Sequence, residues 1–178
     1  MAEIGDPKKL FEHELGMALG AERKVLATLR KLEQSARREE LKQQFHQHLE
    51  ETEGQIENVE QALQAIGASG GHESEAAEGI AAEGEKLLGK VDEELIDAVL
   101  LGAAAKTEHV EIAMYEGLIT KAEAMGADDV VALLEENLEQ ADDVVALLEE
   151  NLEQERHTLE EVKQAAEKLS KELAAQAA

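Results

Sequence analysis

Residues 103–118 read AAAKTEHVEIAMYEGL, a run of good helix formers whose apolar side chains recur at helical spacing. With about 100° per residue, one face of this helix is apolar, and it consists of Leu101, Ala104, Tyr115, Leu118, Ile119 and Ala122. Glu108 and Glu111 fall in the middle of that face, one turn apart. The pattern therefore predicts a helix that turns two carboxylates toward the protein interior.

Inward carboxylates are expensive, because an ionised group without a partner in an apolar interior costs several kcal/mol. The last helical stretch adds a third, since Glu155 lies among apolar positions on the same wheel, with Asn151 one turn earlier; these positions are Leu148, Leu152, Leu159 and Val162. An acid-rich chain also places some glutamates on any face by chance. Three inward carboxylates on two helices nevertheless favour a site where metal or hydrogen-bond partners compensate them.

Five helical stretches follow from the apolar periodicity and from glycines that end helices. They are expected at about 6–35, 38–67, 73–88, 92–125 and 128–174. Asp6 and Pro7 form a helix start, and Gly67, Gly89 and Gly126 form stops. Short hairpins join the first pair and the last pair of long helices, and a long crossover with a short extra helix joins the pairs. We expect a single all-α domain over residues 1–178, a ferritin-like antiparallel four-helix bundle.

Composition excludes several classes of function. The chain has 41 acidic and 17 basic residues and a formal charge of -24, which would repel nucleic acid. No apolar run approaches the roughly 20 residues that span a bilayer, and the N-terminus does not resemble a signal peptide. We therefore expect a cytoplasmic protein that binds neither nucleic acid nor membrane. The absence of cysteine excludes thiol chemistry and thiolate metal sites.

The helix expected at 38–67 carries a histidine near its apolar face. His48 and Gln55 point toward that face, and Glu51 and Glu53 lie on its two borders. The wheel leaves open which of these two glutamates faces the interior. A lone histidine is more often a packed core residue than a ligand, but its i,i+3 relation to Glu51 favours a shared site.

The first long helix adds Glu22 at the edge of its apolar face, and Glu14 is a further candidate. Several carboxylates with one imidazole, contributed by four helices, suit iron or manganese; zinc is a less expected alternative. Tyr115 is expected to donate a hydrogen bond to one of these carboxylates.

An identical repeat lies in the last helix, where ADDVVALLEENLEQ occupies residues 127–140 and again residues 141–154. This tandem duplication of two heptads adds about 21 Å of helix and about 40° of rotation, so the helix stays amphipathic. The residue equivalent to Glu155 after the first copy is Ala141. Because only the second copy leads into Glu155, we expect copy two to sit in the bundle and copy one to lie outside it. Copy one then loops out, lengthens both helices, or sends the last helix into a domain-swapped homodimer.

Four segments resemble one known family, the YciE/YciF-like stress proteins. They are ELGMALGAERKVL at 14–26, HLEETEGQIENVEQ at 48–61, AAAKTEHVEIAMYEGL at 103–118 and LLEENLEQERHTLEEV at 147–162. The resemblance covers nearly the whole chain apart from one copy of the repeat. It implies a ferritin-like bundle, similar to rubrerythrin in its core, with a dinuclear metal centre and a tendency to dimerise.

Carried over by motif, the resemblance implies a set of metal ligands in each long helix, namely Glu22, the His48 to Glu53 stretch with Glu51, Glu108, Glu111 and Glu155. One departure stands out, because Leu159 replaces an aspartate that the family usually has one turn after this last glutamate. The loss of that carboxylate puts full oxidase activity in doubt.

Two hypotheses about function follow. The first is a dinuclear iron or manganese carboxylate protein that reacts with oxygen or peroxide in a stress response. The second is a non-enzymatic helical interaction or scaffold protein, or an engineered duplication variant, whose metal site has decayed. Leu159 and the identical repeat favour the second hypothesis, and the inward glutamates favour the first.

Overall fold

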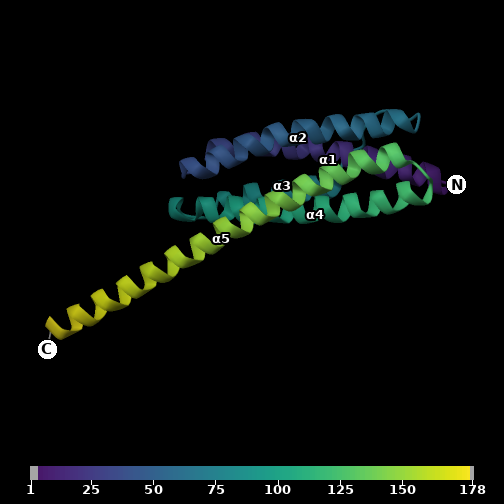
Figure 1. Cartoon of the computed structure of the whole chain (residues 1–178). Coiled ribbons are helices and arrows are strands. Elements are labelled where there is room, and N and C mark those ends of the chain that lie inside the picture. The colour runs from purple at the N-terminus through teal and green to yellow at the C-terminus, as the bar shows by residue number, and fades with distance from the viewer. Residues whose placement is uncertain (1–3, 177–178) are drawn as a thin grey trace.

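The computed structural model describes the backbone of residues 4–176 and the side chains of residues 4–151 and 153. Within this part of the chain the secondary structure is helical, without strands (Figure 1). The helices are α1 (Pro7–Ser35), α2 (Glu39–Ala65), α3 (Glu75–Leu88), the 3₁₀ turn η1 (Glu93–Leu95), α4 (Ile96–Ala124) and α5 (Asp128–Gln176). The predicted all-α class is confirmed.

The four long helices pack as a closed ring. α1 lies against α2, α2 against α5, α5 against α4, and α4 against α1, while the crossover helix α3 lies on α4 and α1 (Figure 1). The two hairpins, α1–α2 and α4–α5, are antiparallel, and the crossover lets α4 run in the same direction as α2. Among the described residues, no helix combines the length and apolarity needed to cross a bilayer.

Local signals explain where the helices begin and end. The Asp6 carboxylate accepts a hydrogen bond from the Lys9 backbone N–H at 2.9 Å, and Pro7 follows as the first helical residue. Gly126 ends the α4 side of its hairpin with a φ of 68°, a left-handed conformation that favours glycine. The cap residue of α2, Arg38, makes no capping side-chain hydrogen bond. A residue of another helix caps the start of α2 instead.

That external cap is Asp97 of α4. Its carboxylate accepts hydrogen bonds from the backbone N–H groups of Arg37 at 2.7 Å and Arg38 at 3.0 Å. Asp97 is buried, so the two N–H groups at the helix start are satisfied without water. The contact ties the α1–α2 turn to the beginning of α4.

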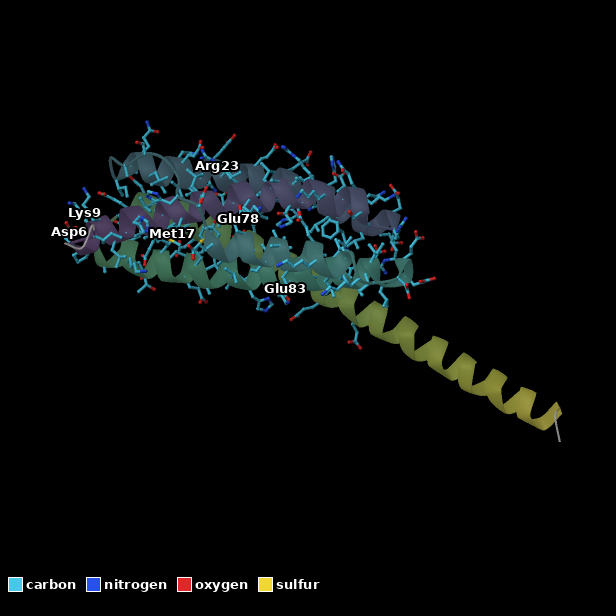
Figure 2. All side chains as sticks on the ribbon, turned by 180° about the vertical axis from the view of Figure 1, so that it is seen from behind. Asp6, Lys9, Met17, Arg23, Glu78 and Glu83 are labelled. Atoms are coloured by element: carbon cyan, nitrogen blue, oxygen red, sulfur yellow. The ribbon has the colours of Figure 1, made fainter. Side chains whose placement is uncertain are left out.

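The crossover packs closely against α1 at two glycines, Gly16 and Gly20. The His72 backbone N–H donates to the Gly16 carbonyl oxygen at 2.8 Å. A Cβ added to Gly20 would lie 1.7 Å from the His72 carbonyl oxygen, so only glycine permits this close approach. Farther along, charged side chains of α3 lie on the outer surface, where Figure 2 labels Glu78 and Glu83.

The core consists of two apolar clusters with a polar layer between them. The Phe11 cluster, nearest the Gly126 turn, includes Leu15, Leu63, Leu118, Val130 and Leu134. The Phe45 cluster, toward the other end, includes Leu29, Leu41, Leu101, Val144 and Leu148. The layer between them holds Glu22, His48, Glu108 and Glu111, and we call these four residues with Tyr115 the carboxylate layer.

The seating of the repeat differs from the prediction. Copy one lies inside the bundle, with Val130, Leu134 and Asn137 at most 2% exposed. Copy two follows beside the Phe45 cluster, and α5 then continues alone beyond the other helices (Figure 1). The prediction that copy one lies outside the bundle is therefore wrong. Copy one is packed because the Gly126 turn passes directly into it, with the Ala127 N–H bonded to the Ala122 carbonyl oxygen at 3.0 Å.

Candidate metal centre

The carboxylate layer is assembled from three helices. Glu22 comes from α1, His48 from α2, and Glu108 and Glu111 from α4. All four are at most 5% exposed, and the three glutamates at most 2%. Buried carboxylates at this density are rare in a plain helical core. They contrast with the charged side chains that surround the bundle, such as Arg23, which is half exposed (Figure 2).

Two hydrogen-bonded pairs lie in the layer, one between His48 and Glu108 and one between Tyr115 and Glu22. His48 Nε2 lies 3.0 Å from Glu108 Oε1, and His48 Nδ1 lies 3.5 Å from Glu51 Oε2 at the edge of the layer. On the other side, the Tyr115 hydroxyl donates to Glu22 Oε1, as the sequence predicted for a carboxylate partner. The layer thus holds two separate hydrogen-bonded pairs between two apolar clusters, and Glu111 lies in it without a hydrogen-bond partner among the described residues.

Asn137 of α5 closes the network from the fourth helix. Its Nδ2 donates to the Tyr115 hydroxyl oxygen at 3.0 Å and to the Gln55 carbonyl oxygen at 3.1 Å. Its Oδ1 accepts from Asn58 Nδ2 at 2.8 Å. Asn137 was missed from the sequence, although its repeat equivalent Asn151 was noted on the same face as Glu155, and the repeat itself was the available signal.

Several acceptor atoms remain without a partner among the described residues. They are Glu22 Oε2, Glu108 Oε2 and both carboxylate oxygens of Glu111. His48 Nδ1 likewise makes no hydrogen bond of good geometry. Buried polar atoms of native proteins nearly always have partners, so this group of atoms indicates a ligand or protons that bind here.

The environment shifts the proton affinities of the layer. Burial, partly offset by the Tyr115 hydrogen bond, raises the pKa of Glu22 from 4.5 to about 7. Burial, together with the charges of Glu22 and Glu108, raises the pKa of Glu111 well above 4.5. Metal-free, the layer therefore holds protons on carboxyl groups that would be ionised in water.

His48 shifts in the opposite sense to the usual buried histidine. Burial alone would lower its pKa, but hydrogen bonds to Glu108 and Glu51 outweigh that effect and raise the pKa from 6.5 to about 9. The hydrogen bond from His48 in turn lowers the pKa of Glu51. Without a metal, His48 is thus a cation that partly balances the carboxylates.

The donor types fit hard cations such as iron and manganese, which bind carboxylate oxygen and imidazole nitrogen. The unpartnered carboxylate oxygens are available for coordination. Within the described residues, however, no three histidine or acidic side chains are arranged to hold an ion as they stand. His48 and Glu108 bond to each other, so metal binding requires the imidazole to release its proton and both side chains to turn.

The remaining predicted ligands lie in different places. Glu51 lies beside His48 with its side chain 30% exposed, whereas Glu53 is 61% exposed and lies 3.6 Å from Arg30. The structure therefore brings Glu51, and not Glu53, to the edge of the layer. Glu14 lies 2.6 Å from Lys121, away from the layer. The side chain of Glu155 lies outside the described residues, as does that of Leu159.

The residue of α5 level with Glu111 is Ala141. The Asn137–Tyr115 hydrogen bond sets the register of this antiparallel pair, and Ala141 lies four residues after Asn137 while Glu111 lies four before Tyr115. Ala141 is fully buried. Copy one thus places a methyl group where the predicted seating of copy two would have placed the Glu155 carboxylate.

A small apolar cavity of about 60 Å³ adjoins the layer between α1, α3 and α4. Its lining includes Val25, Leu29, Ala81, Ala103 and the buried carboxylate Glu108. A dry space of this size suits a small apolar molecule better than a polar substrate. It lies on the side of Glu108 where the crossover helix covers the bundle.

Comparison with known proteins identifies relatives of the whole bundle. Residues 6–175 match the family described as a domain of unknown function, DUF892. The chain is 37% identical to Protein YciF of Escherichia coli K12 over 134 residues, which are 74% of this chain and 81% of that protein.

Two solved structures resemble the bundle. YcfI of Rhodopseudomonas palustris has a TM-score of 0.80 at 32% identity, covering 83% of this chain and 95% of that one. The E. coli stress protein YciF has a TM-score of 0.77 at 34% identity, covering 82% and 93%. Both likenesses span most of each chain.

Proposed function

The chain belongs to the DUF892 family, and we propose that it is a carboxylate metal protein that binds two ions of iron or manganese in its carboxylate layer. The observation that carries the proposal is the set of buried, unpartnered oxygens of Glu22, Glu108 and Glu111 beside His48. Zinc is the alternative ion. As in the E. coli relative called a stress protein, the proposed role is in a stress response.

In the proposed site, metal ions would replace the protons of the buried carboxyl groups. Metal-free, Glu22 and Glu111 hold protons because burial penalises their charged forms. With a divalent cation bound, Glu22 and Glu111 would be ionised and their protons released to solvent, and His48 would be a neutral nitrogen donor. Glu22, Glu108 and Glu111 would bind the ions, with His48 as the nitrogen donor and Glu51 at the open edge.

Bound ferrous iron would supply electrons to dioxygen or peroxide. The protein's part is to keep the layer dry and to hold protons close by. The Phe11 and Phe45 clusters exclude water from both sides. The Tyr115 hydroxyl keeps a proton at Glu22, because burial and the nearby charges of Glu22 and Glu111 raise its pKa well above 10. The apolar cavity beside Glu108 offers space for a small apolar oxidant such as dioxygen.

Metal content tests the proposal directly. The chain is stripped with a chelator, loaded anaerobically with ferrous or manganous ion, desalted and analysed for bound metal. We expect about two ions per chain, loss of binding in Glu108→Ala and Glu111→Ala, and normal binding in Glu116→Ala, whose exposed side chain lies on the same helix. Absence of bound metal from the loaded wild-type chain would refute the proposal.

A scaffold protein without a metal is the second candidate, and one observation favours it. No three donors among the described residues surround a common point, and Ala141 stands level with Glu111. In that case the carboxylate layer binds no metal, and its buried carboxyl groups stay protonated. Adding ferrous iron in air would then change neither the absorbance nor the melting temperature of the wild-type chain.

A further inference from the structure

Because the two copies of the repeat are identical, α5 could pack against the bundle in two registers. In the observed arrangement, which we call the first seat, Val130, Leu134 and Asn137 of copy one pack against the Phe11 cluster and the carboxylate layer. Copy two supplies identical residues fourteen positions later, namely Val144, Leu148 and Asn151. Any contact made by copy one can therefore be made by copy two.

Resting on the proposed metal binding, we propose that α5 has a second seat, displaced by fourteen residues toward the Gly126 turn. In the second seat, copy two makes the contacts that copy one makes in the first, and Glu155 takes the place of Ala141. Cations in the carboxylate layer select this seat. The helix is thus a switch that adds a carboxylate to the site when metal arrives.

Such a displacement is possible because the buried positions of α5 repeat every seven residues. The buried positions are Val130, Leu134, Asn137, Ala141, Val144, Leu148 and Asn151, at alternating spacings of four and three. A shift of two heptads moves the helix by about 21 Å and places the stripe of copy two against the Phe11 cluster. The residues that then take the places of Ala141, Val144, Leu148 and Asn151 are Glu155, Thr158, Val162 and Ala165. Asn151 would then bond to Tyr115 and Gln55 in place of Asn137.

Within the carboxylate layer, the two seats differ at one position of α5. In the first seat the methyl group of Ala141 lies level with Glu111, and no charge is added to a layer that already holds three carboxyl groups. In the second seat Glu155 would add another buried carboxylate. Without cations this addition costs several kcal/mol, whereas two divalent ions carry four positive charges that three carboxylates do not balance.

The second seat also carries a fixed penalty. Copy one leaves the bundle and must serve as the connection after Gly126, and Asn151 gives up its contacts with Gln44 at 3.0 Å and Arg38 at 3.2 Å. The metal-free chain therefore rests in the first seat. Metal shifts the population only by its differential affinity for the two seats.

A distance measurement on the full chain tests the proposal. The chain has no cysteine, so spin labels can be placed uniquely at Gln64→Cys on α2 and Glu150→Cys on α5, both exposed positions. Diamagnetic Zn²⁺ is the probe, and labelled chains are diluted with unlabelled ones so that only distances within a chain are counted. We expect Zn²⁺ to shorten the axial separation of the labels by about 21 Å.

Two matched variants test the seats without metal. Asn137→Leu removes the hydrogen bonds to Tyr115 and Gln55 from the first seat only, and should populate the short distance in metal-free protein. Asn151→Leu removes them from the second seat, and should abolish the zinc-induced shift. Equal distance distributions in both variants would overturn the proposal.

A single-copy chain separates this inference from the proposed function. Deleting residues 141–154 leaves Glu155 directly after copy one, so the only seat contains the glutamate. If zinc binds this chain and the full chain while the label distance in the full chain stays long, metal binding stands and the second seat is refuted. If zinc binds only the single-copy chain, the second seat is likewise refuted. If zinc, iron and manganese bind neither chain, the proposed function fails and the metal-driven switch fails with it.

Discussion

Replacing Glu22 by glutamine should flatten the pH dependence of stability in the metal-free protein. Glu22 is fully buried, and its pKa is raised from 4.5 in the unfolded chain to about 7 in the folded one. Between these values the folded state keeps a proton that the unfolded state releases. The free energy of unfolding therefore falls as the pH rises from about 4.5 to about 7, and the penalty is complete above that range.

The size of the effect follows from the shift. Each pKa unit corresponds to about 1.4 kcal/mol, and most of the 4.5-to-7 interval lies between pH 5 and pH 8. Ionisation of Glu22 should thus remove roughly 2 to 3 kcal/mol of stability between these two pH values. Glutamine keeps the shape and can still accept the Tyr115 hydroxyl proton through Oε1, but it has no charge to bury.

His48 contributes a slope of the same sign that the substitution leaves in place. Its raised pKa of about 9 stabilises the folded state below pH 6.5, and this stabilisation is lost as the pH rises toward 9. The wild-type chain should therefore lose stability from pH 5 to pH 8 through both groups. The variant should lose less, and the difference between the two chains reports the ionisation of Glu22 together with its effect on the neighbouring Glu111.

Urea denaturation followed by circular dichroism, with chelator present, provides the assay. The stability difference between Glu22→Gln and wild type should grow by roughly 2 to 3 kcal/mol from pH 5 to pH 8 in favour of the variant. Glu116→Gln, an exposed acid on α4, is the control and should follow the wild type. Parallel curves for wild type and Glu22→Gln would refute the buried, proton-holding carboxyl group.

Three further predictions concern other parts of the bundle. Asp97→Ala removes the cap of α2 and should lower the free energy of unfolding by about 2 kcal/mol in urea melts, whereas exposed Asp92→Ala should change it by less than about 0.5 kcal/mol. Gly20→Ala places a Cβ against the crossover carbonyl and should speed proteolysis between α2 and α3, whereas Gly54→Ala, with no atom within 4 Å of its Cβ, should stabilise α2 and leave the crossover protected. Ala103→Leu fills the cavity beside the carboxylate layer and should slow aerobic oxidation of bound ferrous iron several-fold in stopped-flow absorbance, with unchanged metal content; an unchanged rate would argue against the cavity as the space for the oxidant.

The helical wheel was sufficient to find the buried glutamates of α4. Glu108 and Glu111 lie at the centre of a long apolar face, so a helix rotation of a few tens of degrees does not expose them. Glu51 and Glu53 lie on opposite borders of a face, and there the same rotation decides which one reaches the layer. Only the packing of α2 against its neighbours resolves this choice, and it favours Glu51.

Contacts between distant segments were beyond the sequence pattern. Asp97 caps a helix that begins about sixty residues earlier, and its own neighbours predict only the first turn of α4. The sequence pattern shows Asn137 only as a polar residue on an apolar stripe. Its role becomes clear from its hydrogen bonds to Tyr115 and Gln55 on other helices. Such residues satisfy buried groups of other helices, and their partners depend on the register between helices.

The seating of α5 is a different kind of failure, because two registers satisfy the sequence equally well. Propensity, apolar period and the residues that face the Phe11 cluster are the same for both copies of the repeat. The registers differ in the connection after Gly126, in the residues that face the Phe45 cluster, and in the presence of Ala141 or Glu155 beside Glu111. The first favours copy one by keeping fourteen residues packed, and the second depends on the charge already in the layer. If the proposed second seat exists, the occupancy of the site by protons or cations decides which copy is buried, and the register of this helix depends on the electrostatics of the site.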